Sequence, residues 1–385
     1  MTKTREGRER QYLHRNIAAG RCQNGIGIPP ISRAEFMRDL PEFMANVYEK
    51  RPLGNQSGSP FQFNIGGTGF FTQFYLWMLV RALQPKHIIE SGAYNGLGTW
   101  TLRQAAPNAQ IIVVSPATPH LYIDNHADSL YFTDVHFRDF AAIDWSCVKR
   151  IDRSQTLIFF DDHQSGYRRM LEAHARGFRH LLFDDNSMPE RSDSDHFSAK
   201  GACAAFNGSL HVPSPGTLKW DDFRGIVADW GRFKKGVFNV SEEQLQKVAH
   251  SFGKVIDVYA EMPPLWTGGR HRPDAPYALL DQDAAKVFVE QHAHNLRSAW
   301  TENRGYANFG YVHTKSLNDA PANELYYPGH VAANGYQGIL PVETGRCDRR
   351  SSGGASPAKL KPTRERDDPR RNSGAGVKSD LRPSN

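Results

Sequence analysis

Short apolar runs and amphipathic stretches alternate along the chain between residues 70 and 186. The runs whose length and continuous hydrophobicity suit buried strands are 87–90, 110–114, 135–137, 156–160 and 180–183. The stretches whose spacing of apolar positions suits helices are 70–83, 99–106 and 167–176. Gly177 follows the last of these stretches, in the place of a helix C-cap. Elements that alternate in this way predict a doubly wound, mostly parallel α/β sheet with helices on both faces.

The pattern weakens after residue 187. One amphipathic helix is predicted at 241–252, and strands are predicted at 255–260 and 309–314. We expect these late strands to be antiparallel and to complete the same sheet. Residues 31–340 are therefore interpreted as one domain, in which 187–340 form an irregular extension.

The two ends of the chain differ in composition from its middle. Residues 351–385 contain no aromatic residue and are rich in Ser, Gly, Pro and charged residues, so we expect 341–385 to be a disordered basic tail. Residues 1–30 are polar and interrupted by Gly and Pro, which predicts a flexible arm. The tail carries a net charge of +5 and residues 1–20 carry +3, whereas the residues between them carry −2. The overall charge of +6 therefore comes from the ends and gives no case for a nucleic-acid enzyme.

Two further features bear on where the protein works. The most apolar stretch, 70–80, is too short to span a bilayer, and the N-terminus lacks the apolar core of a secretory signal. We therefore expect a cytoplasmic protein without a membrane span. The cysteines lie far apart with no CxxC pair, which predicts reduced thiols; they are Cys22, Cys147, Cys203 and Cys347. The sequence leaves the assembly open, with a homodimer as one option.

A glycine-rich turn joins the first predicted strand to the next helix. Glu90 is followed by Gly92, Gly96 and Gly98, and Thr99 can cap the helix. Glycines at such a turn let the chain reverse sharply and let a ligand approach the backbone. Ligands of open parallel sheets bind beyond the carboxyl ends of the strands, so we interpret the turn as a binding loop. A tight turn that binds nothing is the alternative.

Acidic residues follow two of the predicted strands in equivalent positions. Residues 161–163 (Asp-Asp-His) come directly after the run at 156–160, and residues 184–186 (Asp-Asp-Asn) come directly after the run at 180–183. If the two strands are neighbours, both groups emerge at the same edge of the sheet. Oxygen ligands of this kind suit Mg²⁺, Ca²⁺ or Mn²⁺. The alternative is that these residues only cap the turns and helices that follow.

The glycine turn resembles motif I of the class I S-adenosylmethionine-dependent methyltransferases. This resemblance implies a Rossmann-like fold in which the residues around Glu90, Gly92, Gly96 and Gly98 hold the amino-acid portion of the cofactor. The family usually has an acidic residue after the second strand to bind the ribose, and Ser115 stands there in this chain. Asp139 is the best match to the residue that contacts adenine.

The two acidic groups resemble those of metal-dependent O-methyltransferases of the catechol, caffeoyl-CoA and sugar-modifying types. Carried over by position, the resemblance implies that Asp161, Asp185 and Asn186 bind one divalent cation, with Mg²⁺ expected. The family commonly has an acidic residue at the position of His163. An imidazole titrates near neutral pH, so we expect His163 to act as the general base. The alternative is that His163 is a residue at the helix start that only bonds to the neighbouring carboxylates.

The sequence therefore favours an S-adenosylmethionine-dependent enzyme that methylates an oxygen of a small hydroxylated substrate, a sugar or an aryl compound, with the help of a divalent cation. A bound cation would lower the pKa of the substrate hydroxyl and orient it. Two alternatives stay open. One is a degenerate, non-catalytic binding protein on the same fold, and the other is a different metal enzyme such as a hydroxylase-like relative.

Overall fold

The computed structural model describes eleven segments of the chain: 32–52, 67–148, 151–186, 198–207, 219–223, 235–239, 242–262, 264–266, 279–280, 282–291 and 309–326. The arm expected at 1–30, the tail expected at 341–385 and much of the extension expected at 187–340 lie outside these segments.

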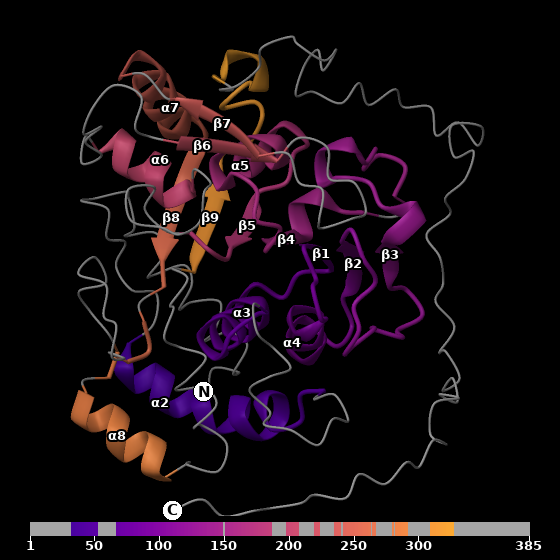
Figure 1. The fold of residues 1–385 in the computed structure, drawn as a ribbon, viewed down its shortest axis with the longest axis vertical. Helices are drawn as coiled ribbons and strands as arrows, with labels where there is room; N and C mark the ends of the chain where they lie inside the picture. The colour runs from indigo at the N-terminus through magenta and orange to yellow at the C-terminus, as the bar shows by residue number, and fades with distance from the viewer. Residues whose placement is uncertain are drawn as a thin grey trace, which may run out of the picture.

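A seven-stranded sheet forms the centre of the molecule (Figure 1). Its strands are β1 (His87–Ser91), β2 (Gln110–Val114), β3 (Leu130–Phe132), β4 (Thr156–Phe160), β5 (His180–Phe183), β8 (Ile256–Glu261) and β9 (Gly310–Thr314). They lie in the order β3-β2-β1-β4-β5-β9-β8. The first five strands are parallel to one another, whereas β9 is antiparallel to both β5 and β8. This confirms the expected Rossmann-like, mostly parallel sheet with antiparallel late strands.

Helices cover both faces of this sheet, as Figure 1 shows. One face carries α3 (Phe70–Leu83) and α4 (Leu97–Ala105), and the other carries α5 (Gly166–Ala175), α6 (Ala199–Phe206) and α7 (Glu242–Val255). The remaining helices are α2 (Arg33–Phe43), η1 (Met44–Tyr48), η3 (Asp134–His136), η4 (Phe140–Ala142), η5 (Arg153–Gln155), α8 (Gln282–Gln291) and η8 (Ala322–Glu324). A separate two-stranded ladder consists of β6 (Lys219–Phe223) and β7 (Lys235–Asn239).

The continuous apolar runs of the sequence are explained by burial on both faces of the sheet. Successive residues of a strand point to opposite faces, so Ile88 belongs to the core on the α3 side and Ile89 to the core on the α5 side. Phe159 and Phe160 divide between the two cores in the same way. Strands buried on both faces show no alternation of apolar and polar residues, as the sequence indicated.

Helix α3 is apolar on nearly all sides because it lies between the sheet and an outer layer of helices. Phe74 of α3 contacts Phe36 of α2 edge to face, with ring centroids 5.1 Å apart, and Phe36 contacts Phe288 of α8 at 6.2 Å. None of the helices in the described part of the chain has both the length and the apolar character needed to cross a membrane.

Three local expectations need correction. The third strand lies at Leu130–Phe132 and not at 135–137, because Tyr131 is buried and pairs with Val113 whereas Val135 is 83% exposed within η3. The helix after the glycine turn begins at Leu97, so Thr99 lies inside its first turn and does not cap it. The expectation of reduced thiols is also wrong for two of the cysteines, because Cys147 and Cys203 are disulfide-bonded. The other two cysteines lie outside the described residues.

The topology brings the loops after β1, β4 and β5 to one edge of the sheet. Ser91 pairs with Phe160, and Phe160 pairs with Phe183, so the three parallel strands end side by side. The strand order reverses between β1 and β4, which is the position where open α/β sheets bind their ligands. The glycine turn and both acidic groups therefore open toward a shared region.

Candidate active site

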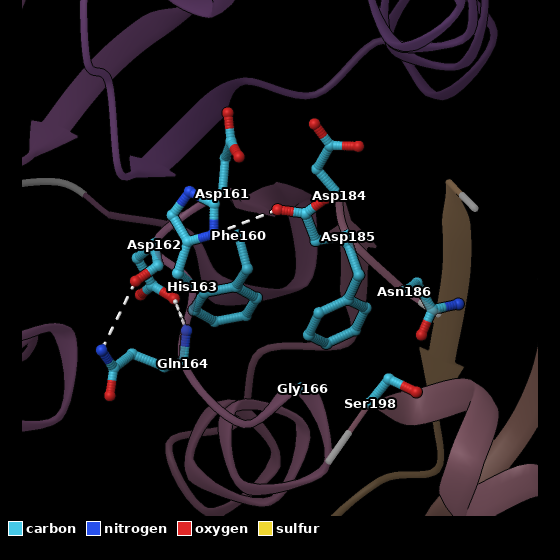
Figure 2. Close-up of a pocket in the computed structure, with 11 residues that line it drawn as sticks. Phe160, Asp161, Asp162, His163, Gln164, Gly166, Asp184, Asp185, Asn186 and Ser198 are labelled. Atoms are coloured by element: carbon cyan, nitrogen blue, oxygen red, sulfur yellow. Dashed lines mark hydrogen bonds and ion pairs between the residues drawn. The ribbon is translucent and has the colours of Figure 1, made fainter. Parts of the chain in front are cut away.

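Two acidic groups and a histidine meet beyond the ends of β4 and β5. His163 Nδ1 lies 3.0 Å from Asp185 Oδ2. One ligand atom from each of Asp161, His163 and Asp185 lies within 4.8 Å of the other two. Figure 2 shows these side chains at the rim of the sheet, with the carboxylates of Asp161 and Asp184 pointing to the same side. A cleft opens there, and Gln164 and Ser198 also line it.

The backbone at this site is strained. His163 has a φ of +53° and Asp185 a φ of +50°. Both values lie in the left-handed region, which residues other than glycine rarely adopt. Strained residues persist only where their surroundings fix them, and they gather at functional sites. Here the two strained residues are the two that contact each other.

The carboxylates of this cluster repel one another. Desolvation, followed by the charges of Asp184 and Asp185, raises the pKa of Asp161 well above its usual range. Desolvation and the charge of Asp185 raise the pKa of Asp184 to about 7. Burial and nearby like charges both shift a carboxylate in this direction, and the charge of His163 offsets only part of the shift at Asp184. A bound cation would remove the repulsion.

The start of helix α3 covers the cluster, a contact that the sequence analysis missed. Thr68 Oγ1 lies 3.4 Å from Asp161 Oδ2, and Thr72 Oγ1 donates a hydrogen bond of 3.1 Å to Asp184 Oδ1. No sequence pattern indicates this contact, because α3 precedes β1 and its threonines stand in an otherwise apolar stretch. The two hydroxyls orient carboxylates that are far away in sequence.

Asn186, expected as a metal ligand, lies apart from the cluster and points away from it in Figure 2. It is 1% exposed, its Oδ1 accepts a hydrogen bond from the backbone N–H of Lys200 at 2.9 Å, and its Nδ2 donates one of 2.9 Å to the Tyr259 hydroxyl. Gly310 leaves room for this amide, since a Cβ there would lie 2.4 Å from Asn186 Nδ2. In this arrangement Asn186 joins β5 to α6 and β8, and His163 takes the third place in the cluster.

His163 has the partner that a general base needs. Its hydrogen bond with Asp185 is the largest cause of a pKa raised above 6.5, and the charges of Asp185 and Asp184 act in the same direction. A carboxylate bonded to one ring nitrogen orients the imidazole and stabilises its protonated form. The side chain of His163 is 44% exposed, so it is accessible from the cleft.

The donor set of this site fits a divalent cation. Asp161 and Asp185 offer carboxylate oxygens, and the 4.8 Å group also contains an imidazole nitrogen. Carboxylates suit Mg²⁺, Ca²⁺ and Mn²⁺, and an added imidazole also suits Zn²⁺ and Fe²⁺.

The glycine turn is built for close backbone contacts. Gly92 has a φ of +92°, and a Cβ at this residue would lie 2.2 Å from the carbonyl oxygen of Asp161. Gly96 has a φ of +89°, and a Cβ there would lie 2.2 Å from the carbonyl oxygen of Tyr122. Both positions therefore require glycine, and the turn packs directly against the loop that carries Asp161.

Glu90 is a buried acidic residue at the base of this turn. Thr99 donates a hydrogen bond to Glu90 Oε2, whereas Glu90 Oε1 has no hydrogen-bond partner among the described residues. Gly98 makes room for Oε1, because a Cβ at Gly98 would lie 2.3 Å from that atom. Desolvation raises the pKa of Glu90 to about 8. An unpaired buried carboxylate oxygen is the type of group that a cationic ligand satisfies.

The two residues expected at the adenosine end of a cofactor are placed differently. Ser115 is 1% exposed, and its backbone N–H donates to the carbonyl oxygen of Phe132. Both carboxylate oxygens of Asp139 accept hydrogen bonds from Arg169, at 3.0 and 2.5 Å. Desolvation opposes ionisation of Asp139, but Arg169 outweighs it and lowers the pKa to about 2. Asp139 is therefore already paired, whereas Glu90 Oε1 at the base of the glycine turn has no hydrogen-bond partner among the described residues.

No protein-family model matches the chain, and no curated protein matches it. Similar solved structures include the O-methyltransferase TomG from Streptomyces achromogenes, involved in tomaymycin synthesis, in complex with S-adenosylmethionine. TomG shares 12% identity with this chain, over 73% of this chain and 96% of TomG, at a TM-score of 0.35. An O-methyltransferase from Bacillus cereus in complex with S-adenosylhomocysteine shares 12% identity, over 80% of this chain and 96% of its own, at a TM-score of 0.28.

A cyclopropane-fatty-acyl-phospholipid synthase-like protein from Lactobacillus casei shares 11% identity, over 71% of this chain and 99% of its own, at a TM-score of 0.35. TM-scores below 0.5 carry no functional inference, so the fold class rests on the strand order and register described above.

Proposed function

We propose that this protein is an S-adenosylmethionine-dependent O-methyltransferase that uses a divalent cation and acts on a small hydroxylated substrate. The observation that carries the proposal is the meeting of Asp161, His163 and Asp185 within 4.8 Å at the strand ends where the glycine turn also opens. An acid–base pair and a cation site next to a cofactor loop match the needs of methyl transfer to oxygen.

Each residue has a separate task in this proposal. Asp161 and Asp185 hold the cation, and His163 accepts the proton of the substrate hydroxyl while Asp185 orients its ring. Glu90 and the turn at Gly92 bind the amino-acid end of the cofactor. When bound, S-adenosylmethionine supplies the methyl group. A divalent cation, when bound, lowers the pKa of the substrate hydroxyl that accepts the methyl group.

The proposal is tested by calorimetry of the full chain with S-adenosylmethionine and, separately, with Mn²⁺ and Mg²⁺, followed by a screen of sugar and catechol acceptors with labelled cofactor. We expect binding of both cofactor and cation, and methyl transfer that stops in EDTA and returns with added Mn²⁺ or Mg²⁺. Methyl transfer that is unchanged in EDTA would overturn the metal part.

The two roles open to His163 are separated by His163→Gln. If His163 is the base, this variant keeps its cation affinity and loses methyl transfer. If His163 is instead a ligand, the cation affinity falls as well. A variant with full activity would exclude both roles.

A second candidate is a binding protein that has lost catalysis. It is favoured by the absence of an acidic residue at Ser115 and by the pairing of Asp139 with Arg169, which together leave the adenosine end with few polar contacts. Cation binding without any binding of S-adenosylmethionine would support this candidate over the enzyme.

A further inference from the structure

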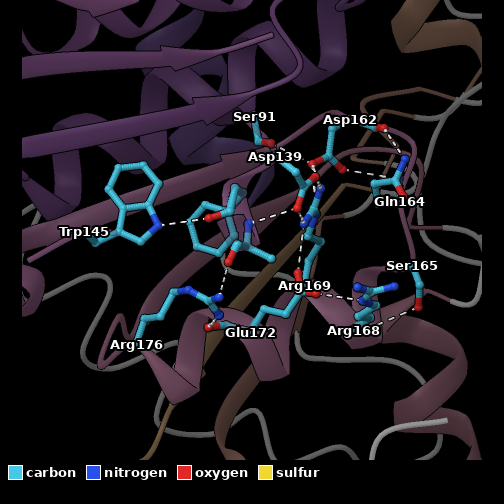
Figure 3. Close-up of polar contacts among 12 residues, drawn as sticks. Ser91, Asp139, Trp145, Asp162, Gln164, Ser165, Arg168, Arg169, Glu172 and Arg176 are labelled. Atoms are coloured by element: carbon cyan, nitrogen blue, oxygen red, sulfur yellow. Dashed lines mark hydrogen bonds and ion pairs between the residues drawn. The ribbon is translucent and has the colours of Figure 1, made fainter. Parts of the chain in front are cut away.

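A network of charged groups, shown in Figure 3, adjoins the candidate site, because its member Asp162 lies between Asp161 and His163 in the chain. At its centre is Arg169 of α5, whose side chain is 4% exposed. Its guanidinium donates to both oxygens of Asp139, to Asp162 Oδ2 at 2.9 Å and to Glu172 Oε2 at 2.8 Å. One arginine therefore connects the loop after β3, the loop after β4 and helix α5.

Asp162 is the member of this network that reaches the site. Besides Arg169, its carboxylate accepts hydrogen bonds from the Ser91 hydroxyl at 2.6 Å and from the backbone N–H of Gln164 at 3.2 Å. Ser91 is the last residue of β1, so the network also includes the strand that leads into the glycine turn. Asp162 is held from three directions.

The two chain neighbours of Asp162 are residues of the candidate site. Asp161 precedes it and His163 follows it, so a fixed Asp162 limits where both side chains can point. His163 also has a left-handed backbone, which the chain leaves unless its surroundings hold it there. In its present conformation His163 Nδ1 reaches Asp185.

We propose that Arg169 is a positioning residue: by holding Asp162, it fixes the turn from Asp161 to His163 in the conformation that brings His163 to Asp185 and makes the cation site. The role in cation binding rests on the proposed function above, whereas the effect on the turn does not. Lysine cannot replace Arg169, because an ammonium lacks the fork of donors that reaches Asp139, Asp162 and Glu172 together.

Arg103 supplies a matched control. It is a second buried arginine, 10% exposed, with Asp124 at 2.7 Å. It also donates to the carbonyl oxygens of Ala106, Pro107 and Ala109, which lie before the start of β2 and hence at the opposite edge of the sheet. Arg103→Lys removes a comparable buried fork that makes no contact with the loops carrying Asp161, His163 and Asp185.

The test compares Arg169→Lys and Arg103→Lys with the wild-type chain by two measurements. The first is Mn²⁺ affinity, measured by electron paramagnetic resonance. It is measured at a temperature where circular dichroism shows that all three proteins are folded. We expect Arg169→Lys to weaken Mn²⁺ binding at least about tenfold, as for other groups that orient metal ligands, and Arg103→Lys to bind as the wild type does. Equal affinities in all three chains would overturn the positioning role in cation binding.

The second measurement needs no metal. Amide hydrogen exchange at 161–164 should become faster in Arg169→Lys and stay unchanged in Arg103→Lys. If the wild type binds no Mn²⁺, the metal part of the proposed function fails, and this measurement still decides whether Arg169 holds the turn. If Arg169→Lys does not fold, Ser91→Ala removes one donor to Asp162 with little change of volume, and it should show the same two effects more weakly. Unchanged exchange in a folded variant would overturn the proposal.

Discussion

His163 and Asp185 face each other across the ends of β4 and β5, with 3.0 Å between Nδ1 and Oδ2 and a left-handed backbone at both residues. The two residues belong to different loops but are adjacent in space, because β4 and β5 are parallel neighbours in register. This contact joins two acidic groups that are separate in the sequence into one cluster, in which we propose a proton acceptor and a cation site.

Asp185→Asn and Asn186→Ala should affect different properties although the residues are neighbours: the first cation affinity, the second stability. Asp185→Asn removes a charged ligand, so we expect Mn²⁺ affinity to fall about 100-fold or more, beyond the loss typical of groups that only orient ligands. Asn186→Ala leaves the Lys200 N–H and the Tyr259 hydroxyl without their buried partner, so it should lower the free energy of unfolding by about 2 kcal/mol. Its Mn²⁺ affinity should not change.

Metal titration and urea denaturation of both variants check this pair. A large loss of Mn²⁺ affinity in a folded Asn186→Ala protein would return Asn186 to the ligand set that the sequence motif implied.

Glu90→Gln should change both stability and cofactor binding. The pKa of Glu90 rises from 4.5 to about 8 through desolvation, so the folded state keeps a proton that the unfolded state releases. The contribution of Glu90 to the free energy of unfolding is then fully present below pH 4.5 and is lost as the pH rises toward 8. The loss is on the order of 4 kcal/mol. The glutamine of the variant does not titrate, which should remove most of this loss.

Urea denaturation of the wild type and of Glu90→Gln at pH 5 and pH 8 measures the effect. Calorimetry with S-adenosylmethionine should show weaker binding by the variant, because a glutamine amide cannot ionise to pair with a cationic ligand. A variant with the same pH slope as the wild type would show that Glu90 is ionised in the folded protein.

The fold could be predicted from the sequence because its strongest signals are local. The strands at 110–114, 156–160 and 180–183 are as expected, since a short run of consecutive apolar residues between turn signals is typical of a buried strand. The strand expected at 135–137 was wrong because β3 has only one fully buried side chain, Tyr131, and therefore almost no pattern.

The candidate site could be predicted only in part. The glycine turn and the acidic groups were visible because they follow strands, and strand ends are predictable. The position of Asn186 could not be predicted, because its partners Lys200 and Tyr259 come from α6 and β8, and only the folded chain brings them together. The pairing of Asp139 with Arg169 was hidden for the same reason.

Gly92→Ala should disrupt the glycine turn beyond the cost of its backbone angle. For any residue with a side chain, a left-handed backbone costs about 1 to 2 kcal/mol, and at Gly92 a Cβ would also lie 2.2 Å from the carbonyl oxygen of Asp161. Gly177→Ala is the matched control. Gly177 has a φ of +79°, but its nearest contact is Arg153 Cδ at 3.7 Å, so only the backbone cost applies.

We expect Gly92→Ala to lower the free energy of unfolding clearly more than Gly177→Ala and to abolish binding of S-adenosylmethionine, which Gly177→Ala should retain. Urea denaturation and calorimetry measure the two effects. Equal losses of stability would mean that the loop carrying Asp161 moves freely away from the turn.

His180→Gln should make the protein less sensitive to mild acid. His180 lies at the start of β5 beside His313 of β9, with ring centroids 4.7 Å apart, and its Nδ1 lies 2.8 Å from the Tyr311 hydroxyl. Desolvation, then the charges of His313 and Arg179, lowers the pKa of His180 to about 4. The folded state therefore keeps His180 neutral at pH values where the unfolded state takes up a proton.

The sign of the effect follows from this difference. The contribution of His180 is fully present above pH 6.5 and is lost as the pH falls toward 4, by about 2 kcal/mol between pH 7 and pH 5. A glutamine cannot take up the proton, so the free energy of unfolding of His180→Gln should fall less over this interval than that of the wild type. His313 and Asp257, which lies 2.7 Å from His313 Nδ1, remain in both proteins. Urea denaturation at pH 7 and pH 5 measures the two slopes, and identical slopes would place the acid sensitivity of the fold outside His180.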